Sequence, residues 1–198
     1  MTTLLGFDSE TTGLVEDYSI PSDDPSNPHL VQLAAKQIDA ESREVIQSMD
    51  FIVFPNGWII SKESIAMHGI DNHKAAALGL QEKDVVGMFI RLCESSDKIF
   101  AHNASFDKKI IRIALMRHFG RERADWFKNK FYNAKDKPKK TICTMYPSKK
   151  AFGGGSLEHA YKSITGESVP NAHNAMADVV ACETILWGLV DRGHLVIE

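Results

Sequence analysis

The 198-residue sequence has few cysteines and no long apolar run, and these absences exclude several classes of protein. Its three cysteines, Cys93, Cys143 and Cys182, are far apart and form no Cys-x-x-Cys pair, and one is left over in any pairing. We therefore expect reduced thiols. No apolar run approaches the roughly 18 residues of a membrane span, and no basic segment followed by an apolar one opens the chain. We expect a soluble, cytoplasmic protein without a membrane partner.

Internal repeats and low-complexity tracts are also lacking, which argues against a repeat array or a disordered chain. The length suits one well-buried α/β domain and is short for two, so we expect a single domain over residues 1–198. The charge is unevenly distributed. Residues 121–150 hold ten basic and three acidic side chains, and the overall net charge of −3 leaves about −10 for the rest. A polyanionic partner or a lysine-rich solvated loop would explain this segment.

The pattern of apolar residues predicts strands first and then strands alternating with helices. A short polar connection suggests a hairpin between the second and third strands, and the acidic, proline-rich residues 15–29 read as an exposed loop. This order is typical of an α/β sandwich with a mixed sheet. The predicted strands are Thr3–Ser9, Leu30–Ile38, Glu44–Phe54 and Lys98–Ala101. The predicted helices are a short one from Ser61 that Gly69 terminates, Gln81–Cys93, Ser105–Phe119 and Asn174–Asp191, followed by a short apolar run at Leu195–Ile197.

Two acids, Asp8 and Glu10, follow the apolar run of the first predicted strand. The period of two places both side chains on one face of that strand. Two carboxylates in one small site raise each other's pKa unless a cation or a proton lies between them. The pair therefore suggests a metal site or an acid/base pair, and a solvated strand end is the alternative for the pair taken alone.

Two further aspartates lie on the apolar faces of predicted helices. Asp107 shares its face with Ile110 and Leu115. Asp178 shares its face with Ile185 in the same way. A buried, unpaired carboxylate costs several kcal/mol, so each needs a cation, hydrogen bonds or water. Each one alone is also explained as a first-turn residue that interacts favourably with the helix dipole.

Four inward carboxylates from one strand and two helix starts suit two hard divalent cations, Mg²⁺ or Mn²⁺. A pair of such ions usually serves phosphoryl transfer, in which water attacks the phosphorus. A base for that water is then needed. His173 lies at the start of the last helix, five residues before Asp178, and only this position favours it over the other seven histidines.

Three segments in order resemble the motifs of a known family. They are Phe7-Asp8-Ser9-Glu10-Thr11-Thr12-Gly13-Leu14, Ala101-His102-Asn103-Ala104-Ser105-Phe106-Asp107 and His173-Asn174-Ala175-Met176-Ala177-Asp178, with Met67-His68-Gly69-Ile70 where the family often carries a His-Gly segment. The set resembles the DEDDh, or DnaQ-like, 3′-to-5′ exonucleases from Thr3 to about Leu189. The resemblance implies a ribonuclease-H-like fold, with a mixed five-stranded sheet flanked by helices, and hydrolysis at a 3′ end with two divalent metals.

The resemblance also implies a role for each matching residue. The metal ligands would be Asp8, Glu10, Asp107 and Asp178, and the general base would be His173.

Six other positions would bind the terminal nucleotide according to the same resemblance. The backbone at Thr11 and Thr12 would touch it, and Leu14 would wedge beside its base. The remainder of the pocket would be lined by His68, Asn103 and Phe106. Leu14 and Phe106 suit a core position equally well, and His68 beside a glycine suits a helix C-terminus.

Two segments depart from the family pattern: the long loop at residues 15–29 and a basic insertion at about residues 121–140. Within the insertion, aromatic and basic side chains interleave, as they often do in single-strand binders. Our hypothesis is that this segment guides the substrate backbone. The aromatic residues are Trp126, Phe127, Phe131 and Tyr132, and the basic ones are Arg123, Lys128, Lys130, Lys137 and Lys139.

The sequence therefore predicts a metal-dependent 3′-to-5′ exonuclease that acts on single-stranded DNA or a frayed 3′ end, in proofreading or trimming, and releases nucleoside 5′-monophosphates. Its partners would be a nucleic acid with a free 3′ end and, as a further candidate, a DNA polymerase. Two alternatives stay open. The substrate could be RNA, as for small exoribonucleases of the same superfamily, because no residue reports on the 2′-hydroxyl. The chain could also be a silent nucleic-acid-binding or polymerase-docking module, although all five catalytic-type residues are present.

Overall fold

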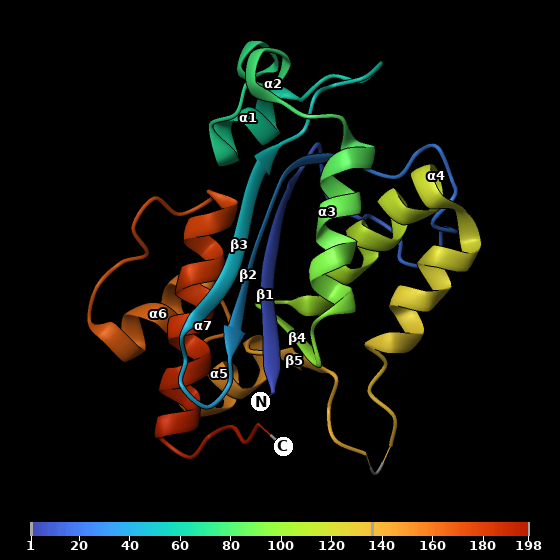
Figure 1. Cartoon of the computed structure of the whole chain (residues 1–198). Helices are drawn as coiled ribbons and strands as arrows, with labels where there is room; N and C mark the ends of the chain where they lie inside the picture. Colours follow the sequence, from blue (N-terminus) through green and yellow to red (C-terminus); the bar gives the residue numbers. More distant parts are fainter. Residues whose placement is uncertain (1, 136, 198) are drawn as a thin grey trace.

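A five-stranded mixed sheet runs through the centre of the computed structural model, which describes residues 2–135 and 137–197 (Figure 1). The strand order is β3-β2-β1-β4-β5. Antiparallel pairing joins β1 to β2 and β2 to β3, and parallel pairing joins β1 to β4 and β4 to β5. The predicted mixed five-stranded sheet is confirmed. The strands are β1 (Thr3–Thr11), β2 (Leu30–Asp39), β3 (Val45–Ile52), β4 (Lys98–Ala101) and β5 (Thr141–Cys143).

The first four strands lie where the alternation of apolar residues places them, and β2 and β3 form the predicted hairpin. The sequence analysis missed β5, which has three residues and no visible period. Residues 15–29 form turns and bends without a regular element, as expected for a loop. The three cysteines are all free thiols.

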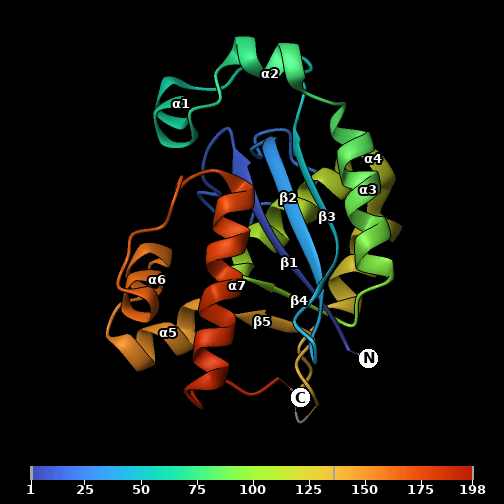
Figure 2. The ribbon, with the colours of Figure 1, turned by 60° about the vertical axis from the view of Figure 1, so that its left-hand side comes forward.

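Helices cover both faces of the sheet (Figures 1 and 2). On one face lie α3 and α4, on the other lies α7 with α5 and α6 beside it, and α1 and α2 sit beyond the end of β3. In the part of the chain that the structure describes, no helix combines the length and the apolar character needed to cross a membrane. The helices are α1 (Lys62–His68), α2 (Asn72–Leu78), α3 (Glu82–Glu94), α4 (Ala104–Lys130), α5 (Met145–Phe152), α6 (Leu157–Thr165) and α7 (Ala175–Asp191).

Four of these helices match predicted ones, and three were missed. Gly69 ends α1 in the left-handed conformation, with φ 69°, as its position suggested. The prediction for α4 was too short, because the chain resumes a helix after Gly120, whose φ of 78° and ψ of 179° interrupt the helix only locally. The missed helices α2, α5 and α6 have seven to nine residues, too few for a clear helical period.

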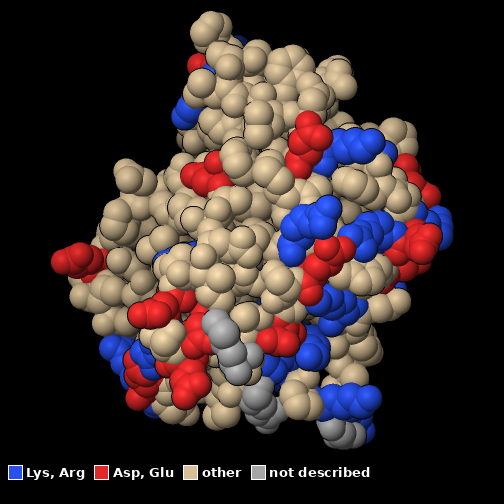
Figure 3. Space-filling view, in the orientation of Figure 1, with Lys and Arg blue, Asp and Glu red and all other residues tan. Residues whose placement is uncertain are grey.

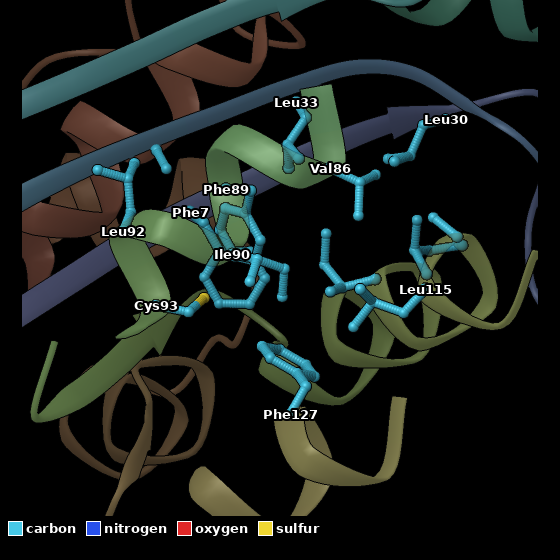
Figure 4. Close-up of a cluster of buried hydrophobic side chains, with 14 of the residues drawn as sticks. Phe7, Leu30, Leu33, Val86, Phe89, Ile90, Leu92, Cys93, Leu115 and Phe127 are labelled. Atoms are coloured by element: carbon cyan, nitrogen blue, oxygen red, sulfur yellow. The ribbon is translucent and has the colours of Figure 1, made fainter. Parts of the chain in front are cut away.

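The largest buried cluster lies between the sheet and the helices α3 and α4 (Figure 4). Its aromatic centre joins Phe7 of β1, Phe89 of α3 and Phe127 of α4, with ring centroids 5.2 Å apart for the first pair and 6.2 Å for the second. Phe127 and Phe131 are completely buried. These two rings therefore cannot take part in the predicted guiding of a substrate, because they hold the second half of α4 against the core.

The basic segment is not a solvated loop over its first ten residues, which are helical. Arg121 pairs with Asp23 at 3.3 Å, Arg123 pairs with Glu94, and Lys130 donates to the Glu94 carbonyl at 2.9 Å. Basic and acidic side chains alternate over the side of the molecule that carries α3 and α4 (Figure 3). Much of the positive charge on this side is thus locally neutralised.

The lysines at the end of that segment lie far from Asp8 and Glu10 along the sheet. The Lys139 carbonyl accepts a hydrogen bond from the side chain of Lys98, the first residue of β4. Lys98 pairs with Leu4 near the start of β1, whereas both acids lie near the end of that strand. Lys137 and Lys139 line a pocket with Lys98, and their guiding role stays a prediction.

Gly6 is required where β1 passes the ring of Phe100 on β4. A Cβ at Gly6 would lie 2.3 Å from Phe100 Cζ, whereas a Cβ at Gly13 would meet nothing within 4 Å. We expect Gly6→Ala to lower the free energy of unfolding by about 1–3 kcal/mol through overpacking. Gly13→Ala is the control and should change it by less than about 0.5 kcal/mol. Urea unfolding measures both, and equal effects would contradict this account of Gly6.

Candidate active site

The strand β1 directs Asp8 and Glu10 to one face of the sheet, as predicted. Leu5 and Phe7 pack into the cluster formed with α3 and α4. Leu4 packs into a cluster with residues of α7, so the even-numbered residues of β1 face α7. The pairing of β1 with β2 is regular as far as Glu10, and its register shifts between Glu10 and Thr11. Both carboxylates therefore stand on a rigid part of the strand, and both are half-buried.

Asp107 comes from the first turn of α4 and is only 3% exposed, which confirms that it faces inward. The Ser9 hydroxyl donates a hydrogen bond of 2.8 Å to Asp107 Oδ1. Ser9 was not among the predicted site residues, although its place between two acids of one strand was a usable signal. This hydrogen bond joins α4 to β1 beside the two strand acids.

Asp178 comes from the first turn of α7 and is 8% exposed, so it also faces inward. Asn174 caps this helix by accepting a hydrogen bond of 3.2 Å from the Ala177 N–H. Asp178 Oδ2 accepts a hydrogen bond of 3.2 Å from the backbone N–H of His173. Its Oδ1 is buried and has no hydrogen-bond partner among the described residues. A buried carboxylate oxygen without a donor is a place where a cation fits.

His173 is exposed and takes up the left-handed conformation, with φ 65°, one residue before the helix cap. Potential ligand atoms of Glu10, His173 and Asp178 all lie within 4.8 Å of one another. The structure thus brings the predicted base beside two of the four predicted metal ligands. This separation is short enough for one ion or one water molecule to contact all three side chains.

Burial raises the pKa of each of the four acids. Burial, and then the charges of the other three acids, raise the pKa of Asp8 well above its usual range. Burial, and then the charges of Asp178 and Asp107, raise the pKa of Glu10 to about 8. Burial raises the pKa of Asp107 to about 7, against the hydrogen bond from Ser9, which lowers it. Burial likewise raises the pKa of Asp178. The cluster therefore favours a bound cation or bound protons at neutral pH.

The predicted nucleotide-binding backbone at Thr11 and Thr12 is held by hydrogen bonds within the protein. Thr11 Oγ1 donates to the Gly13 carbonyl at 2.6 Å, and the Thr12 N–H donates to the His29 carbonyl at 3.0 Å. The Thr12 carbonyl accepts from Ser64 Oγ at 2.9 Å. These bonds fix the turn at the end of β1, and contact of Thr11 and Thr12 with a nucleotide stays a prediction.

The other four predicted nucleotide-binding residues differ in their exposure and contacts. Leu14 is 78% exposed, so the core alternative for it is wrong, whereas Phe106 packs partly buried against the α3–α4 cluster. His68 Nδ1 accepts a hydrogen bond of 3.1 Å from the Ile70 N–H, just beyond the end of α1. Asn103 is exposed in the left-handed conformation, with φ 63°. Contact of these four residues with a nucleotide stays a prediction.

Comparison with known proteins agrees with this geometry. The chain matches the profile of the exonuclease family RNase T over residues 5–186. Its fold is similar to that of Escherichia coli exonuclease I bound to a dT13 oligonucleotide, with a TM-score of 0.74 and 22% identity over 96% of this chain and 41% of that one. For the zinc-bound complex of exonuclease I with single-stranded DNA from the same organism, the TM-score is 0.75 and the identity is 22%, over 97% of this chain and 41% of that one. For a product-bound structure of exonuclease I, the TM-score is 0.73 and the identity is 20%, over 96% of this chain and 44% of that one.

The chain therefore spans less than half the length of these similar structures. No curated protein sequence matches it. At this level of identity the structural similarity establishes the fold, and it confirms the α/β architecture that the sequence predicted.

Proposed function

This chain belongs to the RNase T exonuclease family, and from that premise we propose that it removes nucleoside 5′-monophosphates one at a time from the 3′ end of single-stranded DNA. The observation that carries the proposal is the convergence of four carboxylates and one histidine near the end of β1. The similar fold of exonuclease I, which is bound to a dT13 oligonucleotide in one structure, supports single-stranded DNA as the substrate.

The proposed metal ligands are Asp8, Glu10, Asp107 and Asp178. Their oxygen atoms suit two Mg²⁺ or Mn²⁺ ions. The buried Oδ1 of Asp178, to which no described residue donates a hydrogen bond, supports this assignment. Bound ions would supply the positive charge that stabilises the phosphoryl oxygens in the transition state. The strand and the two helix starts hold the four side chains in place, so little reorganisation is needed when the substrate arrives.

His173 is the proposed general base. Its ring lies beside Glu10 and Asp178, and its exposure lets it pass the proton on to solvent. Imidazole accepts a proton near neutral pH, which a carboxylate bound to a metal does poorly.

Replacement of His173 by asparagine is expected to lower kcat by about 10²- to 10⁴-fold, the usual contribution of a general base. Asparagine tolerates the left-handed backbone of this position, and the side chain is exposed, so the free energy of unfolding should change by less than about 0.5 kcal/mol. Steady-state kinetics on a single-stranded oligonucleotide measure the effect. His73→Asn, at an exposed position of α2, is the control. A variant with native kcat would remove His173 from the mechanism.

A panel of labelled substrates tests the proposed activity itself. We expect 5′-labelled single-stranded DNA to give a ladder of products that shorten by one nucleotide, and matched RNA and blunt duplex DNA to be degraded more slowly. Internal fragments of discrete length would contradict an exonuclease. Degradation of RNA alone would overturn the assignment of DNA as the substrate and favour an exoribonuclease.

A further inference from the structure

Three of the four tyrosines in the sequence line one surface groove of about 510 Å³. Tyr18 comes from the loop after β1, Tyr132 follows the end of α4, and Tyr146 lies at the start of α5. These side chains are 52%, 63% and 65% exposed, which is unusual for large aromatic rings. Segments far apart in the sequence thus present aromatic rings to the same surface channel.

Basic side chains line the same groove. Lys109 and Arg112 come from α4 between its start and Gly120, and Lys128 comes from the end of that helix. Arg112 also makes a 3.6 Å ion pair with Asp125, which is itself half exposed. The residues that line the groove all lie in the described ranges, and none of them is acidic. The groove therefore offers positive charge beside its three rings.

The groove and the acid cluster share the first turn of α4. Ala104 and Ser105, in the first turn of α4, form part of its wall, and Asp107 follows two residues later in the same turn. On the loop side, Lys109 of the same helix donates a hydrogen bond to the Ile20 carbonyl, two residues after Tyr18. A chain bound with one phosphodiester at the acid cluster would therefore find the groove next to it.

We propose that this tyrosine groove, formed by Tyr18, Tyr132 and Tyr146 with Lys109, Arg112 and Lys128, binds the nucleotides of single-stranded DNA that lie upstream of the two at its 3′ end. Exposed tyrosine rings can stack on bases of any sequence, and basic side chains can bind the backbone phosphates. The inference rests on the proposed function, because it takes the acid cluster as the place where the terminal phosphodiester is cut. It uses exposed rings, whereas Phe127 and Phe131 of the basic segment are buried.

The test compares a long and a short substrate in variants of the two most exposed rings. The variant Tyr132→Leu/Tyr146→Leu removes both rings, and Tyr132→Phe/Tyr146→Phe keeps them at the same positions. We expect the leucine variant to raise KM about tenfold or more for a thymidine oligonucleotide of about 16 nucleotides. A thymidine dinucleotide does not extend into the groove, so its kcat/KM should stay within about twofold of the native value. The phenylalanine variant should behave like the native protein on both substrates.

Binding without hydrolysis separates this inference from the proposed function. In EDTA, fluorescence anisotropy of a labelled thymidine 16-mer should show weaker binding to the leucine variant than to the native and phenylalanine proteins. Equal affinity of all three proteins, or an equal loss of activity on the dinucleotide and the long substrate, would overturn the groove proposal. A native chain that binds the oligonucleotide but cleaves neither substrate would contradict the proposed function instead.

A second pair of variants tests the role of positive charge in the groove. Lys128→Gln should reduce the salt dependence of binding by about one unit in the slope of log K against log salt. Lys150→Gln, at an exposed lysine of α5 outside the groove, should leave that slope unchanged. An identical slope for the native and Lys128→Gln proteins would remove Lys128 from the proposed groove.

Discussion

Asparagine in place of Asp8 or Asp107 is expected to lower the rate of mononucleotide release about 10³-fold or more. Each change removes one negative charge from the proposed metal site, and the ions held there would contribute several kcal/mol to the transition state. Asparagine keeps the shape of the side chain, and in Asp107→Asn its oxygen can still accept the hydrogen bond from Ser9. The loss should therefore come from chemistry and not from unfolding. Release of label from a 3′-labelled single strand at saturating Mg²⁺ measures it.

The control for this pair is Asp84→Asn. Asp84 occupies the first turn of α3, as Asp107 occupies the first turn of α4, but it is exposed. Its replacement should leave the rate within about twofold of native, since an exposed surface substitution changes little. Activity of Asp8→Asn or Asp107→Asn close to that of Asp84→Asn would remove the acid cluster from catalysis.

The metal-free protein should lose about 2–4 kcal/mol of its free energy of unfolding between pH 6.5 and pH 8.5. Glu10 and Asp107 have pKa values raised to about 8 and about 7 in the folded chain, far above those of the unfolded chain. The folded protein therefore binds more protons than the unfolded one in this range, so stability falls as the pH rises through the folded pKa values. Below pH 6.5 His29, whose pKa burial lowers to about 4, acts in the opposite direction. The comparison therefore starts at pH 6.5.

Urea unfolding in EDTA and in Mg²⁺ tests this pH dependence. Mg²⁺ should stabilise the protein more at pH 8.5 than at pH 6.5, because ions bind the ionised carboxylates that the metal-free protein tolerates poorly. The double variant Asp8→Asn/Glu10→Gln should show a flatter pH dependence and a smaller effect of Mg²⁺. Stability that rises with pH over this interval in EDTA would contradict the raised pKa values of the cluster.

The sequence predicted the parts of the fold that have a clear period. The alternation in β1 placed Asp8 and Glu10 on one face, and the helical period placed Asp107 and Asp178 inward, as the structure has them. Both periods are local properties of the chain, so they can be read without knowledge of the tertiary contacts. The resemblance to three ordered motifs then supplied the family, which is confirmed.

The elements that the sequence did not reveal are short or depend on distant contacts. The three residues of β5 pair with β4 some forty residues earlier, and no local pattern marks them. The aromatic residues after Gly120 all interleave with basic ones, so the sequence could not distinguish them. Phe127 is buried, whereas Tyr132 is exposed. Burial of one ring and exposure of the other follow from how α4 packs, and this packing is a tertiary property.

The hydrogen bond from Ser9 and the groove at Tyr18 show the same limit on the active-site side. Ser9 reaches Asp107 across 98 residues of sequence. Tyr18 meets Tyr132 and Tyr146 in one groove only because the loop after β1 lies beside α4, where Lys109 donates a hydrogen bond to the Ile20 carbonyl. The sequence contains these residues but not the distances between them, so their proximity could not be predicted from it.

The central claim is that the acids of β1, α4 and α7 form one metal-dependent exonuclease site. The most direct test incubates the native chain with 3′-labelled single-stranded DNA in Mg²⁺ and follows the first labelled product. We predict that this product is a nucleoside 5′-monophosphate and that EDTA abolishes its release. Release that persists in EDTA, or a first labelled product longer than one nucleotide, would contradict the claim.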